Sequence, residues 1–262
     1  IAGVMIASVG LGWTFLLNAS SFIATIVALV RMDTAALFRG SPHQIEGSGV
    51  VEGLRYVWAS PRLRYTLALI GVFSMFALNF SVVLPLLSRF TFGQGAQAFG
   101  FLTSMMALGS VGGALLAAAR KRPTKAVLIA SSGAFGVLAS IAALAPTIGI
   151  LAALLVPIGA ASITVISTAN ATLQLHSSEE MRGRVMALHG LVFLGSTPIG
   201  APIVGWIAET WGPRAGLGVG AAAALACALA GVLFLRREHL SDQLRAIVPG
   251  RARARAVHIR AR

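Results

Sequence analysis

Residues 147–175 read TIGILAALLVPIGAASITVISTANATLQL and contain no charged side chain. A helix that rises 1.5 Å per residue needs about 20 apolar residues to cross the hydrocarbon core of a bilayer, so this run is long enough. It does not alternate polar and apolar residues as the strands of a membrane barrel do. The segment therefore predicts a membrane-spanning helix.

Six further apolar runs of similar character predict spanning helices, at residues 13–30, 65–87, 98–119, 126–145, 185–208 and 212–235. The whole chain of 262 residues is 56% hydrophobic and 11% charged. A soluble domain has about a quarter charged residues, and a disordered chain has few apolar ones, so both classes are excluded. The predicted fold class is an all-α polytopic membrane protein with about seven transmembrane helices.

The basic residues follow a strongly asymmetric pattern along the chain. The net charge is +13, which in a soluble protein would suggest a nucleic-acid partner. Here all but two of the 21 Lys and Arg lie in alternate loops or in the C-terminal tail, the exceptions being Arg89 and Arg214. Because cytoplasmic loops of membrane proteins collect Lys and Arg, we expect a cytoplasmic C-terminus. The expected partner is the lipid bilayer and not nucleic acid.

Two further segments contain apolar residues but are not expected to span the membrane, the first because it is too short and the second because it is too polar. Residues 1–9 look like the end of another helix, and we expect that the start of a longer protein precedes them. Residues 41–64 begin polar and continue into a helical pattern that places Leu54, Val57 and Trp58 on one face. This spacing predicts a short amphipathic helix on the inner membrane surface, ended by Pro61.

Two local motifs resemble a known family. Residues 52–64 read EGLRYVWASPRLR, and residues 179–188 read EEMRGRVMAL and run on into GSTPIGAP at 195–202. These stretches are similar to major facilitator superfamily exporters, in the branch of the enterobactin exporters and related bacterial efflux proteins. In that resemblance the first stretch is the central cytoplasmic segment, and Arg182, Gly183 and Arg184 form a cytoplasmic-loop motif.

The resemblance implies the arrangement of the chain and its activity. Residues 1–31 would be the end of helix five and helix six, 32–64 a cytoplasmic linker, 65–237 the C-terminal six-helix bundle, and 238–262 a basic cytoplasmic tail. The spans would then be helices six to twelve of a twelve-helix fold. The implied function is efflux of drug-like small molecules or siderophores by alternating access in the bacterial inner membrane, with this chain an N-terminally truncated fragment.

Polar and aromatic side chains within two spans are candidates for a substrate pathway. An aromatic stripe with an amide at its edge suits an amphipathic organic molecule. The alternative is that the rings pack against lipid or helices and that the polar groups bond between helices. The candidates are Phe73, Phe76, Asn79 and Phe80 in the second span, and Thr164, Ser167, Asn170 and Gln174 in the fifth.

Glycine and proline residues predict where helices bend or pack closely. Gly195, Pro198, Gly200 and Pro202 are expected to kink the sixth span, either at a moving interface or as a static bend. The G-x-x-x-G spacing from Gly109 to Gly113 predicts close helix packing and not phosphate binding.

The sequence contains no catalytic, metal-binding or cofactor motif, so we predict neither an enzyme nor a cofactor. Its acidic residues fall in loops or at helix ends, so protons, if they drive transport, would be carried by the missing half. His189 is the one ionisable side chain expected inside a span, as a proton relay or as a hydrogen-bonded interfacial residue. The alternative function is a membrane scaffold or assembly subunit without transport.

Overall fold

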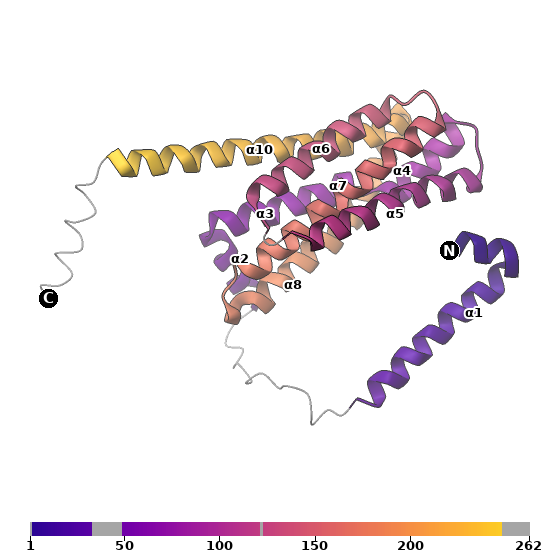
Figure 1. Cartoon of the computed structure of the whole chain (residues 1–262), viewed down its shortest axis with the longest axis horizontal. Coiled ribbons are helices and arrows are strands. Elements are labelled where there is room, and N and C mark those ends of the chain that lie inside the picture. Colours follow the sequence, from indigo (N-terminus) through magenta and orange to yellow (C-terminus); the bar gives the residue numbers. More distant parts are fainter. Residues whose placement is uncertain (1, 33–48, 121–122, 248–262) are drawn as a thin grey trace, which may run out of the picture. The chain divides into compact units, whose positions relative to one another are not determined.

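The computed structural model describes residues 2–32, 49–120 and 123–247 (Figure 1). Most of the predicted linker before residue 49, and the end of the predicted basic tail at 248–262, lie outside the described residues. The chain divides into two compact units, residues 1–47 and 48–262. In the first unit α1 (Ala2–Val30) is a single helix, where the sequence predicted a helix end followed by a separate span. No proline or charged residue interrupts it.

Every element of the second unit that the structure describes is helical. In chain order the elements are α2 (Gly49–Ala59), α3 (Pro61–Val72), the π-helix η1 (Phe73–Ala77), α4 (Phe80–Leu86), the π-helix η2 (Leu87–Thr91), α5 (Ala96–Ala118), α6 (Lys125–Ala143), α7 (Ile148–Leu175), α8 (Glu179–Gly195), α9 (Thr197–Trp211) and α10 (Pro213–Ile247).

Six segments of this unit are long and apolar enough to cross a membrane. Two of them join several elements, namely Pro61–Thr91, which runs from α3 to η2, and Glu179–Trp211, which comprises α8 and α9. The other four are α5, α6, α7 and α10 up to Arg237. The prediction of an all-helical polytopic membrane protein is confirmed.

The outer side of the bundle is apolar as well as its core. On α5 the side chains of Leu108, Leu115 and Leu116 are 61%, 68% and 63% exposed. Exposed leucine in such numbers suits contact with lipid tails and would be an aggregation hazard in water. The inner core is closed by fully buried large side chains, among them Phe73 and Phe135.

Successive spans alternate in direction, so the polar connections gather at two ends of the bundle (Figure 1). We call one of them the α2 end; it comprises α2, the starts of α3, α6 and α8, and the far part of α10. Arg89 and Arg214 lie at the opposite end, and the remaining described Lys and Arg of this unit lie at the α2 end. This distribution agrees with the predicted topology, whereas the compartment that each end faces stays a prediction.

The G-x-x-x-G prediction is confirmed by the packing of α5 on α7. A Cβ atom added to Gly109 would lie 1.8 Å from the carbonyl oxygen of Val156, so the two backbones touch. From the other side, a Cβ atom on Gly159 would lie 2.1 Å from the carbonyl oxygen of Met106. Glycine allows this approach because it has no side chain to hold the backbones apart. The approach is favourable because helices in lipid associate through dispersion contacts and not through the hydrophobic effect.

Candidate functional site

Two of the six spans are interrupted near their middle, and the interruptions lie against each other. In the first, α3 widens into the π-helix η1, and Leu78 and Asn79 separate it from α4. In the second, Ser196 separates α8 from α9. The Oγ atoms of Ser74 and Ser196 are 2.7 Å apart, within hydrogen-bond distance. We call this junction, formed by residues 73–79 and 195–202, the paired break.

The paired break depends on a glycine that the sequence singled out. A Cβ atom added to Gly200 would lie 1.8 Å from the carbonyl oxygen of Met75 and 2.7 Å from its carbonyl carbon. The backbone of α9 therefore rests directly on the backbone of η1. The structure thus brings together the predicted kink residues and the predicted aromatic segment, which lie more than a hundred residues apart in the sequence.

The predicted kink itself takes a form that differs from a bent continuous helix. Pro198 occupies the first turn of α9, directly after the interruption at Ser196, where its missing N–H costs no hydrogen bond. Pro202 lies inside α9. Ser196 ends α8 and begins α9, and its Oγ also donates to the carbonyl oxygen of Phe193. Whether the junction moves during a functional cycle stays a prediction.

Three of the four aromatic-stripe candidates lie in the packed interior. Phe73 and Phe80 meet Phe135 edge to face, with ring centroids 4.9 Å and 6.0 Å apart. Asn79 is 3% exposed, and its Nδ2 donates to the carbonyl oxygen of Met75 at 2.6 Å. The ring contacts are what the packing alternative predicts, whereas the Asn79 bond stays within its own span instead of joining two helices. A contact with cargo stays a prediction, and among these four side chains Phe76 is the one that is partly exposed.

The candidates on α7 do not join the paired break. Thr164 is buried, and its hydroxyl donates to the carbonyl oxygen of Ala160 at 2.7 Å. Ser167 lines a cavity of about 400 Å³ that also involves α5 and the start of α6. Nearer the α2 end, Gln174 Nε2 donates to Asn170 Oδ1 at 2.7 Å. None of these contacts reaches the paired break, and the place of the four α7 residues in a pathway stays a prediction.

The linker helix α2 docks on the start of α8. Glu52 forms an ion pair with Arg184, in which Oε2 lies 2.8 Å from Nη1. Gly53 permits this approach, since a Cβ atom there would lie 3.3 Å from the Cβ of Arg184. Of the predicted loop motif, Arg184 thus holds α2, Arg182 Nε donates to the carbonyl oxygen of Gln174 at 3.2 Å, and Gly183 faces open space.

Hydrogen bonds at the same end join the linker region to the turn between α7 and α8. The backbone N–H of Ser178 donates to the hydroxyl of Tyr56 at 3.0 Å. This bond stabilises the phenolate and lowers the pKa of Tyr56 below its usual value of 10.0. Arg62 Nη1 donates to Nε2 of His176. With the ion pair, the Tyr56 bond makes α2 part of the bundle, while the Arg62 bond joins α3 to the end of α7.

Because α2 docks on the bundle, its exposed apolar face differs from the face that the sequence predicts. The sequence placed Leu54, Val57 and Trp58 on one face, but Val57 is fully buried against the bundle. Leu54 and Trp58 are 43% and 60% exposed, and Val50 and Val51 are exposed beside them. The helix is therefore amphipathic with an outward apolar face, which suits the predicted position at a membrane surface.

The comparisons with known proteins agree with this architecture. The model of the transmembrane secretion effector family, a branch of the major facilitator superfamily, matches residues 1–254. The chain belongs to this family. The chain is therefore a multi-pass membrane protein of a transporter family.

Two curated relatives illustrate the family. The multidrug efflux pump Tap of Mycolicibacterium fortuitum is 28% identical over 222 residues, covering 82% of this chain and 54% of that protein. The Tap pump of Mycobacterium tuberculosis is 27% identical over 224 residues, covering 82% of this chain and 52% of that protein. The chain thus spans about half the length of the curated relatives it matches. No solved structure matches it significantly.

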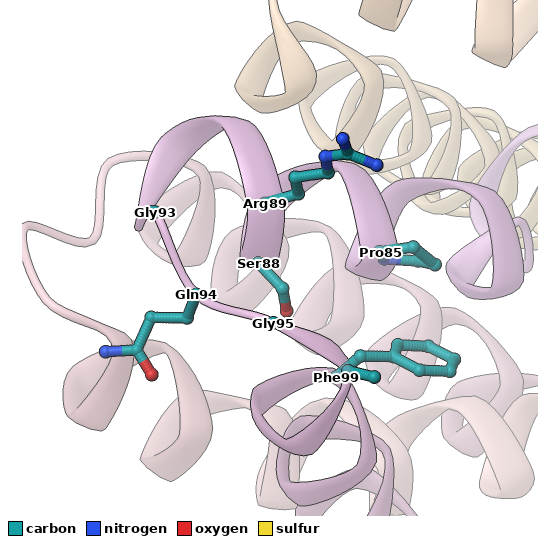
Figure 2. Close-up of a pocket in the computed structure, with 8 residues that line it drawn as sticks. Pro85, Ser88, Arg89, Gly93, Gln94, Gly95 and Phe99 are labelled. Atoms are coloured by element: carbon teal, nitrogen blue, oxygen red, sulfur yellow. The ribbon is translucent and has the colours of Figure 1, made fainter.

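One pocket of this family member involves none of the candidate site residues predicted from the sequence. It has a volume of about 550 Å³ and lies at the turn between η2 and α5 (Figure 2). Ser88 is 2% exposed, and its Oγ has no described hydrogen-bond partner. Figure 2 shows Arg89 and Gln94 pointing away from each other. In the sequence, the glycine at position 93 could have indicated this turn. Its φ is +64°, a backbone conformation that favours glycine, and the turn follows the end of the span.

His189 lies inside α8, as predicted, and is 8% exposed. Its ring stacks on Phe193, with centroids 5.7 Å apart, and its Nε2 has no described hydrogen-bond partner. The structure therefore gives His189 an aromatic neighbour and no described proton-accepting partner. Among the described residues, no group of three or more His, Cys, Asp or Glu is placed to hold a metal ion.

Proposed function

We propose that this chain forms part of an exporter of drug-like small molecules or siderophores in the bacterial inner membrane. The observation that carries the proposal is the match to the multidrug efflux pump Tap, which extends over 82% of this chain. In such transporters two six-helix bundles rock about a site near the middle of the membrane. Residues 65–237 would supply one of these bundles.

The paired break supports alternating access in particular. An interrupted helix has lost part of its continuous hydrogen-bond ladder, so it bends at lower cost than an intact one. Here two interrupted spans touch through Ser74 and Ser196 and through the backbones at Met75 and Gly200. A hinge at this place would let the outer parts of both spans, α4 and α9, move together while α3 and α8 stay in place.

The carboxylate that would couple transport to protons is not found inside the spans that the structure describes. The described Asp and Glu residues sit at the ends of the six spans or beyond them. A carboxylate inside a span is the usual proton carrier of a pump. If protons drive export, we propose that the other half of the transporter provides that carboxylate.

An efflux assay tests the proposed activity. The protein, expressed as its gene encodes it in a bacterial strain stripped of its main drug exporters, should lower the steady-state accumulation of fluorescent amphipathic drugs by several fold. The control is the same strain that expresses, at an equal level, a membrane protein unrelated to transport. Unchanged accumulation of a broad drug panel, with the protein folded in the membrane, would favour the scaffold or assembly-subunit alternative.

The proposed topology can be tested independently of transport. Because Lys and Arg gather at the α2 end, a reporter enzyme that is active only in the periplasm should be silent when fused after Arg237. The same reporter inserted at Gly93, in the turn at the opposite end, should be active. Activity after Arg237 and silence at Gly93 would reverse the assignment of every loop.

A further inference from the structure

A groove lies between the start of α3 and the far part of α10, at the α2 end of the bundle. It has a volume of about 540 Å³, and its lining includes Trp58, Arg64, Tyr65, Ala230, Phe234 and Arg237. Arg64 and Arg237 mark the end of the spanning parts of α3 and α10, since the span of α10 closes at Arg237 and that of α3 opens at Pro61. In a bilayer crossed by these spans, the groove would extend from the headgroup level into the apolar layer.

The floor of the groove is aromatic and held in place. The rings of Tyr65 and Phe234 stack with centroids 5.4 Å apart and planes only 5° from parallel. The Tyr65 hydroxyl donates to the carbonyl oxygen of Cys227 at 3.1 Å, which ties α3 to α10 beneath the groove. Lys125 Nζ lies 5.0 Å from the centroid of the Phe234 ring. An apolar surface is thus fixed beside a third positive charge.

The rim of the groove is cationic. The side chains of Arg64 and Arg237 are exposed and come from different helices. Among the described residues, no acidic side chain forms an ion pair with either guanidinium. Trp58 is 60% exposed at the same rim, and tryptophan is enriched at the headgroup level of membrane proteins.

We propose that this groove binds one anionic phospholipid, with the phosphate between Arg64 and Arg237 and an acyl chain along Tyr65 and Phe234. Guanidinium groups bind phosphate oxygens in a bidentate manner, and basic pockets between spanning helices bind anionic headgroups. A soluble phosphate ion would use the rim and leave the aromatic floor empty. The proposal requires that the α2 end lies at the headgroup level, and it does not require that the chain transports anything.

Lipid retention tests the proposal. The protein, purified in detergent as its gene encodes it, is mixed with phosphatidylglycerol or with phosphatidylcholine of the same acyl chains, and bound lipid is counted by native mass spectrometry. We expect phosphatidylglycerol to be preferred. The double variant Arg64→Gln, Arg237→Gln should bind it about twenty-five-fold more weakly, from about a factor of five for each arginine.

A matched variant distinguishes lipid binding in the groove from a general attraction of anionic lipid to the basic α2 end. Arg55 and Arg236 are also exposed at the α2 end but do not line the groove. The double variant Arg55→Gln, Arg236→Gln removes the same charge and should retain phosphatidylglycerol as the unmodified protein does. Equal losses in the two double variants would overturn the proposal, because the attraction would then be spread over the surface.

Three further arms test the acyl-chain position, binding of free phosphate and the fold of the variants. Ala230→Phe should weaken binding by filling the floor while leaving both arginines in place, and retained binding there would overturn the proposed acyl-chain position. Glycerol phosphate at the same concentration should not displace the lipid, and displacement would indicate a site for free phosphate. Thermal unfolding without added lipid checks that each variant is folded. If the Arg64→Gln, Arg237→Gln variant does not fold, the Ala230→Phe and glycerol phosphate arms still test whether the groove binds a phospholipid.

Discussion

Replacing Gly200 with valine is expected to separate the two halves of the paired break and to remove most of the folded protein from the membrane. A Cβ atom at this position would lie 1.8 Å from the carbonyl oxygen of Met75, and a backbone atom cannot rotate away as a side chain can. Overpacking costs typically 1–3 kcal/mol, and we expect about 3 kcal/mol or more here. The measurement is the amount of monodisperse protein extracted from membranes, together with its thermal unfolding.

The matched control for this prediction is Gly195→Val. At Gly195 the nearest atom to an added Cβ is a side-chain carbon of Leu191 at 4.0 Å, an ordinary contact. This variant should stay close to the unmodified protein in abundance. Gly200→Ala should already show the loss, since the Cβ atom itself makes the clash. Equal abundance of the Gly200 and Gly195 variants would show that α9 does not rest on η1.

Replacing Asn79 with leucine is expected to lower thermal stability and, if the residue lines the pathway, transport as well. Asn79 is buried, and its Nδ2 donates to the carbonyl oxygen of Met75 at 2.6 Å, within the interruption of the helix. Leucine would leave that buried acceptor without this donor, at a cost of about 1–2 kcal/mol. The proposed pathway role predicts, in addition, that efflux per folded molecule falls or that the drug profile shifts.

Measuring both quantities in one strain separates the two roles of Asn79. Ser81→Leu is the matched control, because Ser81 lies on the same span two residues away and is exposed. That variant should change neither stability nor transport. Preserved efflux per folded molecule in the Asn79 variant would remove the residue from the pathway. An unchanged melting temperature would contradict the hydrogen bond as a source of stability.

The class of protein and most of its helices follow from the hydropathy of the chain. Hydropathy is a local property, since about 20 apolar residues are enough to predict a span whatever surrounds them. The runs at 98–119 and 147–175 accordingly became α5 and α7, and the short motifs near Glu52 and Arg182 indicated the family that the comparisons show. The close packing at Gly109 was also predicted, because G-x-x-x-G spacing places both glycines on one helix face.

The tertiary structure alone decided which of these features meet. The sequence marked Asn79 and Gly200 separately, but their junction depends on two backbones touching, and helices in lipid associate through such shape-specific contacts. The same applies to Val57, which was assigned to the free face of α2 and is buried because Gly53 lets that helix lie close to α8. Hydropathy cannot distinguish an apolar side chain that faces lipid from one that faces another helix, since both surroundings are equally apolar.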